Sequence, residues 1–275
     1  MLRRLSRRLV PYFRAASLRF LSLWRLLLFA FVTWTLFDTL LVHRRLDAAG
    51  QQTYLKPQNP VRVYISSLHW NNERILRDSW NQGLLDLVSV LGPGNVFMSL
   101  YESGSRDGSK AAIGELDKAL GVMGVPRNIT LDKTTHADAM ASPPFEPGNG
   151  WIKTPRGRME LRRISYLAQL RNKSLQPLKE MARSGVEFDH VLFLGDVVFT
   201  VPDVFALLNT NNQEYAAACS LDFSKPPRFY DTFALRDIDG HEHATQTWPY
   251  FRSSKSRAAM KRGEPVPVSS CWNGM

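Results

Sequence analysis

The sequence predicts an α/β domain with a mostly parallel sheet flanked by helices, preceded by one N-terminal transmembrane helix. Short β-rich runs alternate with helical patterns after residue 60, which favours a parallel sheet with helical crossovers. A long apolar run lies near the N-terminus, at residues 26–42. The roughly 230 residues that follow the first 45 suffice for one well-buried domain.

The N-terminal segment carries most of the net charge. The whole chain has a formal charge of +10, and residues 1–45 contain nine arginines but one acidic residue, Asp38, for a net +8. The rest of the chain therefore carries only about +2. A nucleic-acid binder should carry its positive charge on the folded domain, so the charge distribution excludes nucleic acid as a partner.

The apolar run predicts a signal anchor. Residues 26–42 alone would span about 25 Å as a helix, and extension back to residue 18 gives about 37 Å, enough for a bilayer core of about 30 Å. Seven arginines precede the apolar core and two follow it, which places the N-terminus in the cytoplasm. A cleaved signal peptide and a mitochondrial presequence are the alternatives. We expect a cytoplasmic tail at 1–17, an anchor at 18–42, a stem at 43–60 and a luminal domain at 61–275.

Two cysteines and two glycosylation sequons also bear on the compartment. Cys219 and Cys271 would pair in an oxidising lumen or remain as free buried thiols, and their spacing does not decide between the two. The tripeptides Asn128-Ile-Thr130 and Asn172-Lys-Ser174 support a luminal domain weakly.

The first half of the domain contains three β-rich runs and two helical patterns. Residues 61–66 and 96–101 are rich in β-branched and aromatic side chains and predict strands. Between them, residues 71–91 carry an apolar stripe with helical spacing, which Gly92-Pro93-Gly94 ends. A second helix is predicted at 109–121 and a short strand at 129–131.

The second half begins with a loop rich in proline and glycine at 141–157. A helical pattern follows over 159–183, in which Pro177 introduces a kink. The run VLFL at 191–194 predicts a central strand, because it is the most continuous apolar run after the anchor. Further strands are predicted at 215–220 and 265–270.

Polar residues follow two of the predicted strands. Asp196 comes directly after the strand at 191–194, and ligands of open α/β sheets bind outside the carboxyl ends of strands. Its carboxylate there would hold a divalent cation that bridges two phosphates; a helix cap or turn is the alternative. Glu102 and Ser103 follow the predicted strand at 96–101, and Glu102 there would accept hydrogen bonds from a nucleotide or belong to a plain polar turn.

Two further groups complete the candidate site. Arg163 and Arg171 lie on the predicted helix 159–183 and would meet a pyrophosphate through charge-assisted hydrogen bonds, unless they belong to a solvated face. The segment 219–240 interleaves carboxylates, among them Asp222 and Asp231, with aromatic residues. This composition suits a carbohydrate pocket and also an ordinary surface.

Several blocks of this sequence, in order, closely resemble fungal glycosyltransferase family 69, which contains the capsule-associated α-1,3-mannosyltransferases. The blocks are 101–105, 163–171, 191–199, 217–223, 229–237, 248–251 and 265–275. The resemblance implies a GT-A-like fold, GDP-mannose as donor, a glycan acceptor, retention of configuration, and Mn²⁺ or Mg²⁺. It also implies type II topology in the Golgi or another secretory membrane. It makes Asp196 the leading metal and nucleotide ligand, and the segment with Asp222 and Asp231 the leading catalytic and sugar-binding candidate.

The sequence departs from that family in two places. Family members usually have Asn where this chain has Gly195, and their domain normally continues past the block that ends this chain. The alternative function is therefore a catalytically inactive relative that acts as a binding or assembly partner in the same membrane.

Overall fold

The computed structural model describes residues 23–44, 61–141, 143–230 and 232–271. Leu23–Arg44 forms one helix with a mean hydropathy of 1.8, long and apolar enough to cross a membrane by length and composition. Its threonine hydroxyls bond back to carbonyls of the same helix, as Thr35 does to Phe31 at 2.9 Å, so these polar groups are satisfied without water. The predicted tail, residues 18–22 of the predicted anchor and residues 45–60 of the predicted stem lie outside the described residues.

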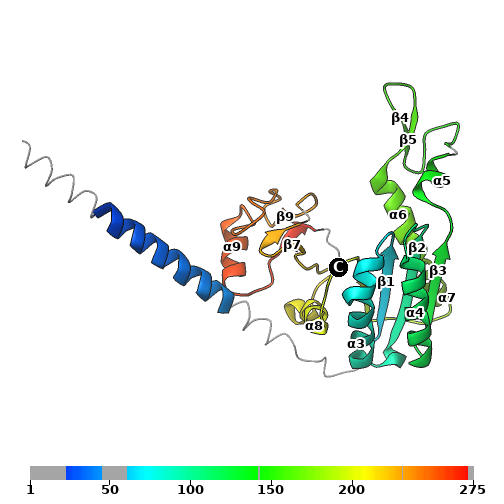
Figure 1. The fold of residues 1–275 in the computed structure, drawn as a ribbon, viewed down its shortest axis with the longest axis horizontal. Helices are drawn as coiled ribbons and strands as arrows, with labels where there is room; N and C mark the ends of the chain where they lie inside the picture. The colour runs from blue at the N-terminus through cyan, green and yellow to red at the C-terminus, as the bar shows by residue number, and fades with distance from the viewer. Residues whose placement is uncertain (1–22, 45–60, 142, 231, 272–275) are drawn as a thin grey trace, which may run out of the picture.

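A four-stranded parallel sheet forms the centre of the domain (Figure 1). Its order is β3-β2-β1-β6, with bounds β1 (Val63–His69), β2 (Val96–Ser103), β3 (Arg127–Asp132) and β6 (His190–Phe193). The chain adds β2 and β3 on one side of β1 and then returns to add β6 on the other side. The strand order therefore reverses between β1 and β6, and this reversal is a topological switch point. The predicted parallel α/β fold is confirmed.

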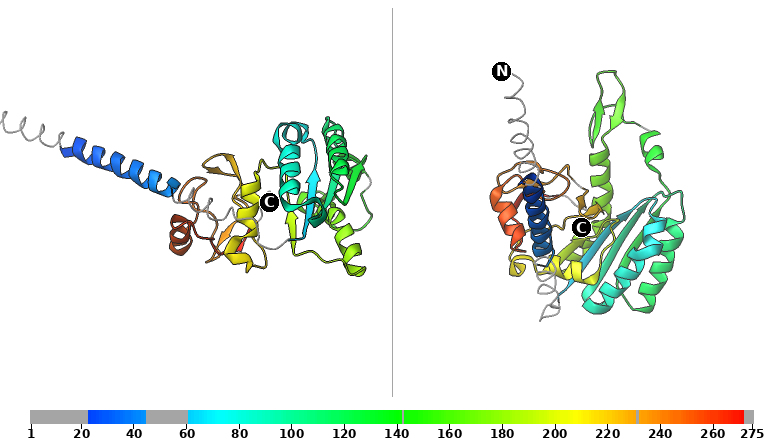
Figure 2. Two further views of the ribbon diagram at one scale, coloured as in Figure 1. Left: turned by 90° about the horizontal axis from the view of Figure 1, so that it is seen from below. Right: turned by 60° about the vertical axis from the view of Figure 1, so that its left-hand side comes forward.

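One face of the sheet packs on the helices that follow β1 and β2 (Figures 1 and 2). The predicted helix 71–91 is observed as α2 (Glu73–Ile75), the π-helical turn η1 (Leu76–Trp80) and α3 (Asn81–Leu91), and Gly92 ends it before a 3₁₀ turn, η2 (Pro93–Asn95). The second predicted helix is α4 (Ser109–Val122). Alternate strand residues such as Val63 and Ile65 join the main core with Trp80, all fully buried.

The opposite face packs on α6 (Arg163–Ser174) and α7 (Gln176–Arg183). The Tyr64 hydroxyl donates to the Ser174 carbonyl at 2.7 Å, and the hydroxyls of Ser66 and Ser174 lie 2.7 Å apart. The helix predicted over 159–183, with a kink at Pro177, is observed as two helices that meet at Leu175. Pro177 has no N–H to donate and its ring excludes a continuous helix, so it lies in the first turn of a second helix.

A hairpin lies between β3 and α6. It follows α5 (His136–Ala141) and pairs β4 (Trp151–Lys153) with β5 (Met159–Leu161) in antiparallel register. Figures 1 and 2 show it projecting beyond the carboxyl ends of the parallel strands. The stretch predicted as a loop at 141–157 therefore contains a strand, and the start of the predicted helix 159–183 is a strand instead.

The C-terminal part contains small elements. They are α8 (Val201–Leu208), the 3₁₀ turn η3 (Thr210–Gln213), β7 (Phe223–Lys225), β8 (Arg228–Phe229), β9 (Arg236–Asp237), α9 (Ser254–Lys261) and β10 (Val268–Ser270). The buried side chains of Phe229, Leu235, Tyr250 and Phe251 form a second small core, against which Cys271 packs, and Cys271 is disulfide-bonded to Cys219.

Two sequence predictions for this part meet different outcomes. The strand predicted at 215–220 is wrong: these residues join no ladder, and three consecutive alanines offer little side-chain surface to a pleated sheet. The strand predicted at 265–270 is confirmed over β10, which pairs antiparallel with β9. The sequence analysis missed α8 and α9, although Thr200 and Asp203 form a capping box that marks the start of α8.

A polar cluster fastens the edge strand β3 to its neighbours. The Tyr101 hydroxyl donates to the Asp132 carboxylate, and Nζ of Lys173 donates to the Tyr101 hydroxyl at 2.7 Å while lying 3.6 Å from Asp132 Oδ2. Burial favours the neutral form of Asp132, but the hydrogen bonds from Tyr101 and Thr134 and the charge of Lys173 outweigh it. They lower the pKa of Asp132 to about 2.

This cluster predicts acid sensitivity. In the unfolded chain Asp132 has a pKa near its ordinary value of 3.8. Below pH 4 the unfolded chain therefore binds a proton at Asp132 that the folded chain does not. The free energy of unfolding should fall as the pH drops from about 4 to about 2. The difference in pKa corresponds to about 2 kcal/mol. Asp132→Asn should lower the free energy of unfolding by about 2 kcal/mol at pH 7 and flatten the profile in that window. Urea unfolding at a series of pH values measures both, and a variant whose pH profile matches that of the native chain would contradict the assignment.

Candidate functional site

The candidate site lies at the switch point between the carboxyl ends of β1 and β6. Crevices at such points bind ligands because loops from the two neighbouring strands diverge there. The register of the sheet pairs Ser66 of β1 with Phe193 of β6, so the residues that follow each of them emerge at the same edge. The segments that build the site are therefore residues 67–72 and 193–196.

Three hydrogen bonds hold three consecutive residues of the segment after β6. The Ser67 hydroxyl donates to the Leu194 carbonyl at 2.7 Å, and Nε1 of Trp80 donates to the Gly195 carbonyl at 2.8 Å. Nδ2 of Asn72 donates to Oδ2 of Asp196 at 2.9 Å. The donors lie in β1 (Ser67), just after it (Asn72) and at the end of η1 (Trp80), so the position of Asp196 is set by a different part of the chain.

Asp196 is exposed and only partly engaged. Its Oδ2 accepts the bond from Asn72, whereas no residue in the described ranges donates a hydrogen bond to its Oδ1. A carboxylate that merely caps a helix or closes a turn accepts bonds from nearby backbone N–H groups. Within the described part of the chain Asp196 accepts none from the backbone, so one oxygen is available to a ligand.

His69 is the last residue of β1 and is fully buried. Its Nε2 lies 2.9 Å from the Ser67 hydroxyl, and its ring meets Trp80 edge-on with centroids 4.5 Å apart. Because Ser67 donates its own proton to Leu194, we assign the proton of the histidine–serine bond to Nε2. Burial lowers the pKa of His69 to about 4, against the opposing charge of Asp196, so the ring is neutral at physiological pH. Sequence reasoning missed His69, Asn72 and Trp80 as site residues.

Glu102 and Ser103 lie at the same edge of the sheet but are already engaged. Glu102 is fully buried, with Oε1 accepting the Ser105 N–H and Oε2 lying 2.8 Å from Nζ of Lys110 on α4. The Ser103 hydroxyl is buried, 3.5 Å from the Tyr166 hydroxyl. Gly104 closes the turn with φ of +62°, where a Cβ would come within 2.3 Å of the Thr134 carbonyl. The polar-turn alternative accounts for these contacts, and nucleotide binding by Glu102 and Ser103 stays a prediction.

The two arginines lie at different places on α6. The guanidinium carbon of Arg171 lies 5.7 Å from the centroid of Phe193, the last residue of β6, which brings this cation close to the site. Arg163 is the first residue of the helix and is exposed. Eight residues correspond to about 12 Å along the axis and about 80° around it, so the two side chains do not share one helix face.

Comparison with known proteins identifies the family. A family model described as Cryptococcal mannosyltransferase 1 matches residues 62–275. The chain belongs to this family. No curated protein and no solved structure matches it. Membership of a mannosyltransferase family supports glycosyltransferase activity, a sugar-nucleotide donor and a glycan acceptor, and the match spans both segments of the switch point.

Membership of a glycosyltransferase family suggests a sugar-nucleotide donor and a divalent cation, and the ligand chemistry of Asp196 fits such an ion. Mg²⁺ and similar hard cations take oxygen ligands and are commonly held by one or two carboxylates together with substrate phosphates. Asp196 supplies one exposed carboxylate with a free oxygen at the switch point. The amide oxygen of Asn72 is already bonded to the Trp70 N–H at 2.8 Å, so Asn72 orients Asp196 and adds no ligand.

A second acidic group in this mannosyltransferase-family chain fits a cation less well. Ligand atoms of Asp237, Asp239 and His241 lie within 4.8 Å of one another. The buried Asp237 carboxylate, however, accepts the N–H groups of Asp239, His241 and Ser253 at 3.0, 2.9 and 2.7 Å. Burial opposes its ionisation, but these bonds outweigh it and lower its pKa. Both oxygens are therefore occupied in closing the turn after β9 and fixing the start of α9.

The predicted catalytic carboxylates remain predictions. Asp222 is partly buried just before β7, and its carbonyl accepts the Tyr230 N–H at 2.9 Å, which closes the β7–β8 hairpin. Asp231 lies outside the described residues.

Proposed function

We propose that this chain is a type II membrane mannosyltransferase of the Golgi or another secretory membrane. It transfers mannose from GDP-mannose to a glycan acceptor with retention of configuration, as an α-1,3-mannosyltransferase. The observation that carries the proposal is the exposed carboxylate of Asp196, held by Asn72 at the switch point of a mannosyltransferase-family domain.

The donor binds with its diphosphate beside the carboxyl end of β6. Asp196 holds Mn²⁺ or Mg²⁺ there, which when bound neutralises charge on the departing diphosphate. Arg171 supplies a second positive charge from α6. His69 is neutral and contributes no charge, so its role is to support the segment that carries Asp196. Glu102, Ser103 and Arg163 extend the nucleotide subsite along the same edge.

The sugar and the acceptor bind to the C-terminal part of the domain, which follows Asp196 in the sequence. Asp222 and Asp231 come from a segment rich in aromatic residues, where carboxylates bind sugar hydroxyls and rings stack on sugar faces. We assign them the catalytic role because this segment lies within the mannosyltransferase-family match and interleaves carboxylates with aromatic residues.

The topology follows from the N-terminal segment. The helix Leu23–Arg44 crosses the membrane with its arginine-rich N-terminal side in the cytoplasm, and the domain at 61–275 faces the lumen. The disulfide between Cys219 and Cys271 supports this placement, because disulfides persist in oxidising compartments.

The test is donor turnover by the full chain in detergent. GDP release from GDP-mannose in the presence of Mn²⁺, with formation of an α-linked product by NMR, is the expected result. UDP-glucose serves as the donor control. A folded chain that binds GDP-mannose without turnover would replace this proposal with the alternative, an inactive family member that acts as a binding or assembly partner.

Asn72 provides a second test of the same site. Asn72→Ala removes the only donor in the described residues that bonds to Asp196, so the carboxylate loses its fixed orientation. Loss of such supporting bonds typically costs 10- to 100-fold in metal affinity, and we expect about a 10-fold weaker apparent affinity for Mn²⁺. Metal titration of GDP-mannose turnover measures it. Gln82→Ala, at an exposed position on α3, is the matched control, and equal metal dependence in both variants would show that Asn72 does not orient the ligand.

A further inference from the structure

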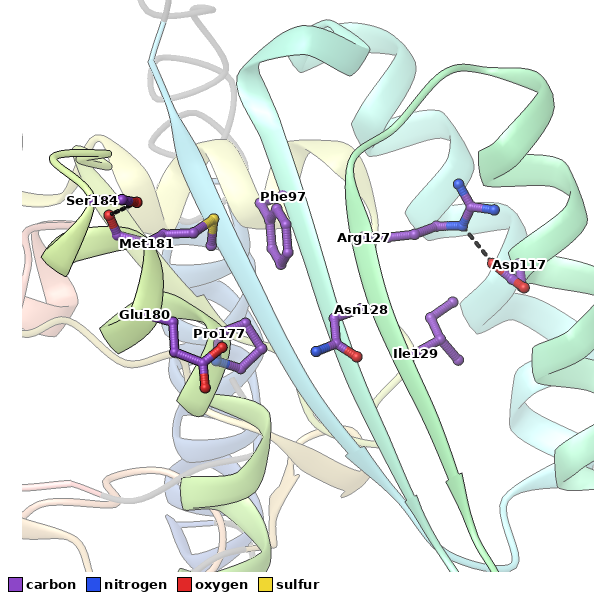
Figure 3. Close-up of a pocket in the computed structure, with 9 residues that line it drawn as sticks. All are labelled: Phe97, Asp117, Arg127, Asn128, Ile129, Pro177, Glu180, Met181 and Ser184. Atoms are coloured by element: carbon purple, nitrogen blue, oxygen red, sulfur yellow. Dashed lines mark hydrogen bonds and ion pairs between the residues drawn. The ribbon is translucent and has the colours of Figure 1, made fainter.

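The end of the sheet opposite the switch point carries a second feature, a hollow in the surface. An open hollow of about 780 Å³ lies between the first residues of β2 and β3 and the helix α7 (Figure 3). Its walls include Phe97, Asn128, Pro177, Glu180 and Met181. The hollow therefore combines an aromatic ring and apolar side chains with hydrogen-bonding groups, a mixture that suits carbohydrate.

The polar residue on the sheet side of this hollow is the asparagine of a sequon. Asn128 is exposed, and Figure 3 shows its amide directed toward the side on which α7 carries Pro177 and Glu180. Residues i and i+2 of a strand share a face, so the Thr130 hydroxyl lies 3.5 Å from Asn128 Oδ1. No residue in the described ranges accepts a hydrogen bond from Asn128 Nδ2, so the nitrogen that would be modified is accessible.

Within the part of the chain that the structure describes, the strand that carries Asn128 has an unpaired edge. β3 pairs with β2 on one side and is the last strand of the sheet on the other. Exposed edges invite pairing with other chains, and proteins cover or charge them. Only Arg127 and Asp132 bring charge to β3, and its middle residues, Asn128 to Leu131, are uncharged.

We propose that Asn128 is N-glycosylated and that the attached glycan lies in the hollow and shields the edge of β3. In the reaction, Nδ2 of Asn128 forms a bond to the anomeric carbon of an oligosaccharide carried on a lipid diphosphate. The bond between that carbon and the diphosphate oxygen breaks, the lipid diphosphate departs, and the amide nitrogen loses one proton. The donor and the transferring enzyme belong to the secretory lumen, so this inference rests on the luminal placement in the proposed function.

The other sequon has a different environment. Ser174 is buried, its hydroxyl donates to the Arg171 carbonyl at 2.8 Å and it meets the Ser66 hydroxyl at 2.7 Å. This serine is thus a packing residue between α6 and β1. Asn172 serves as the internal comparison because its side chain is exposed on α6 but does not line the hollow.

The experiment expresses the full chain in a eukaryotic secretory host and maps glycopeptides by mass spectrometry after endoglycosidase treatment. The native chain and Thr130→Ser should carry a glycan on Asn128, whereas Asn128→Gln and Thr130→Ala should lose it. Asn172→Gln should keep it. Asn128 and Thr130 are exposed, so these variants should fold, and near-UV circular dichroism checks this.

Protease protection on intact microsomes tests the glycosylation of Asn128 separately from the type II topology on which it rests. A protected domain whose Asn128 peptide is unmodified would overturn the glycosylation proposal and leave the mannosyltransferase proposal standing. A domain digested from the cytoplasmic side would overturn the glycosylation proposal together with the type II topology. Modification of Asn128, with or without modification of Asn172, supports the proposal, and modification of Asn172 alone contradicts it.

Discussion

Replacing Asp196 with alanine is expected to abolish mannose transfer, with a loss of about 10³-fold in GDP release. The substitution removes the one exposed carboxylate that the described residues place at the switch point between β1 and β6. The segment itself should survive, because Ser67 and Trp80 still hold the Leu194 and Gly195 carbonyls. The expected defect is therefore in chemistry and metal affinity, with little change in stability.

Two companion variants make this result specific. Asp196→Asn keeps the size of the side chain but removes its charge, so it should lose most of the activity and nearly all of the metal dependence. Asp86→Ala removes an exposed carboxylate on α3, which bonds to Gln82, and should leave GDP release unchanged. Activity of Asp196→Ala within a few-fold of the native chain would eliminate Asp196 as the metal and nucleotide ligand.

Removing the disulfide should destabilise the C-terminal part of the domain by about 4 kcal/mol. The bridge joins Cys219 to Cys271 across 52 residues, and a loop of this length restricts the unfolded chain by about that amount in the chain-entropy model. Among the described residues, the small hydrophobic core of the part it encloses has four buried side chains, those of Phe229, Leu235, Tyr250 and Phe251. A core this small contributes little to offset the loss.

The test combines Cys219→Ser and Cys271→Ser and follows limited proteolysis and thermal unfolding. Cleavage should appear first between the two positions, whereas the parallel sheet should resist longer because its core is larger. Reductant should bring the native chain to the stability of the double variant and leave the variant unchanged. Equal stability of the native chain with and without reductant would show that the disulfide contributes little.

The helices and strands that the sequence predicted correctly are those with strong local patterns. The strand at 191–194 was found because it is a continuous apolar run, and the helix ending at Gly92 because an apolar stripe stops at a glycine and a proline. The pattern over 159–183 is helical on either side of Leu175, and composition alone did not show that Pro177 starts a new helix. The missed helix α8 has few turns and is identified mainly by its capping box.

The sequence by itself determined the parallel α/β fold, the apolar N-terminal helix and the position of Asp196 at the end of a strand, because each depends on residues that are neighbours in the chain. Only the tertiary structure decided which side chains support Asp196. Asn72 and Asp196 are 124 residues apart, and Trp80 and Gly195 are 115 apart. No local pattern encodes contacts of that range, since they arise only when the strand order brings β1 and β6 together.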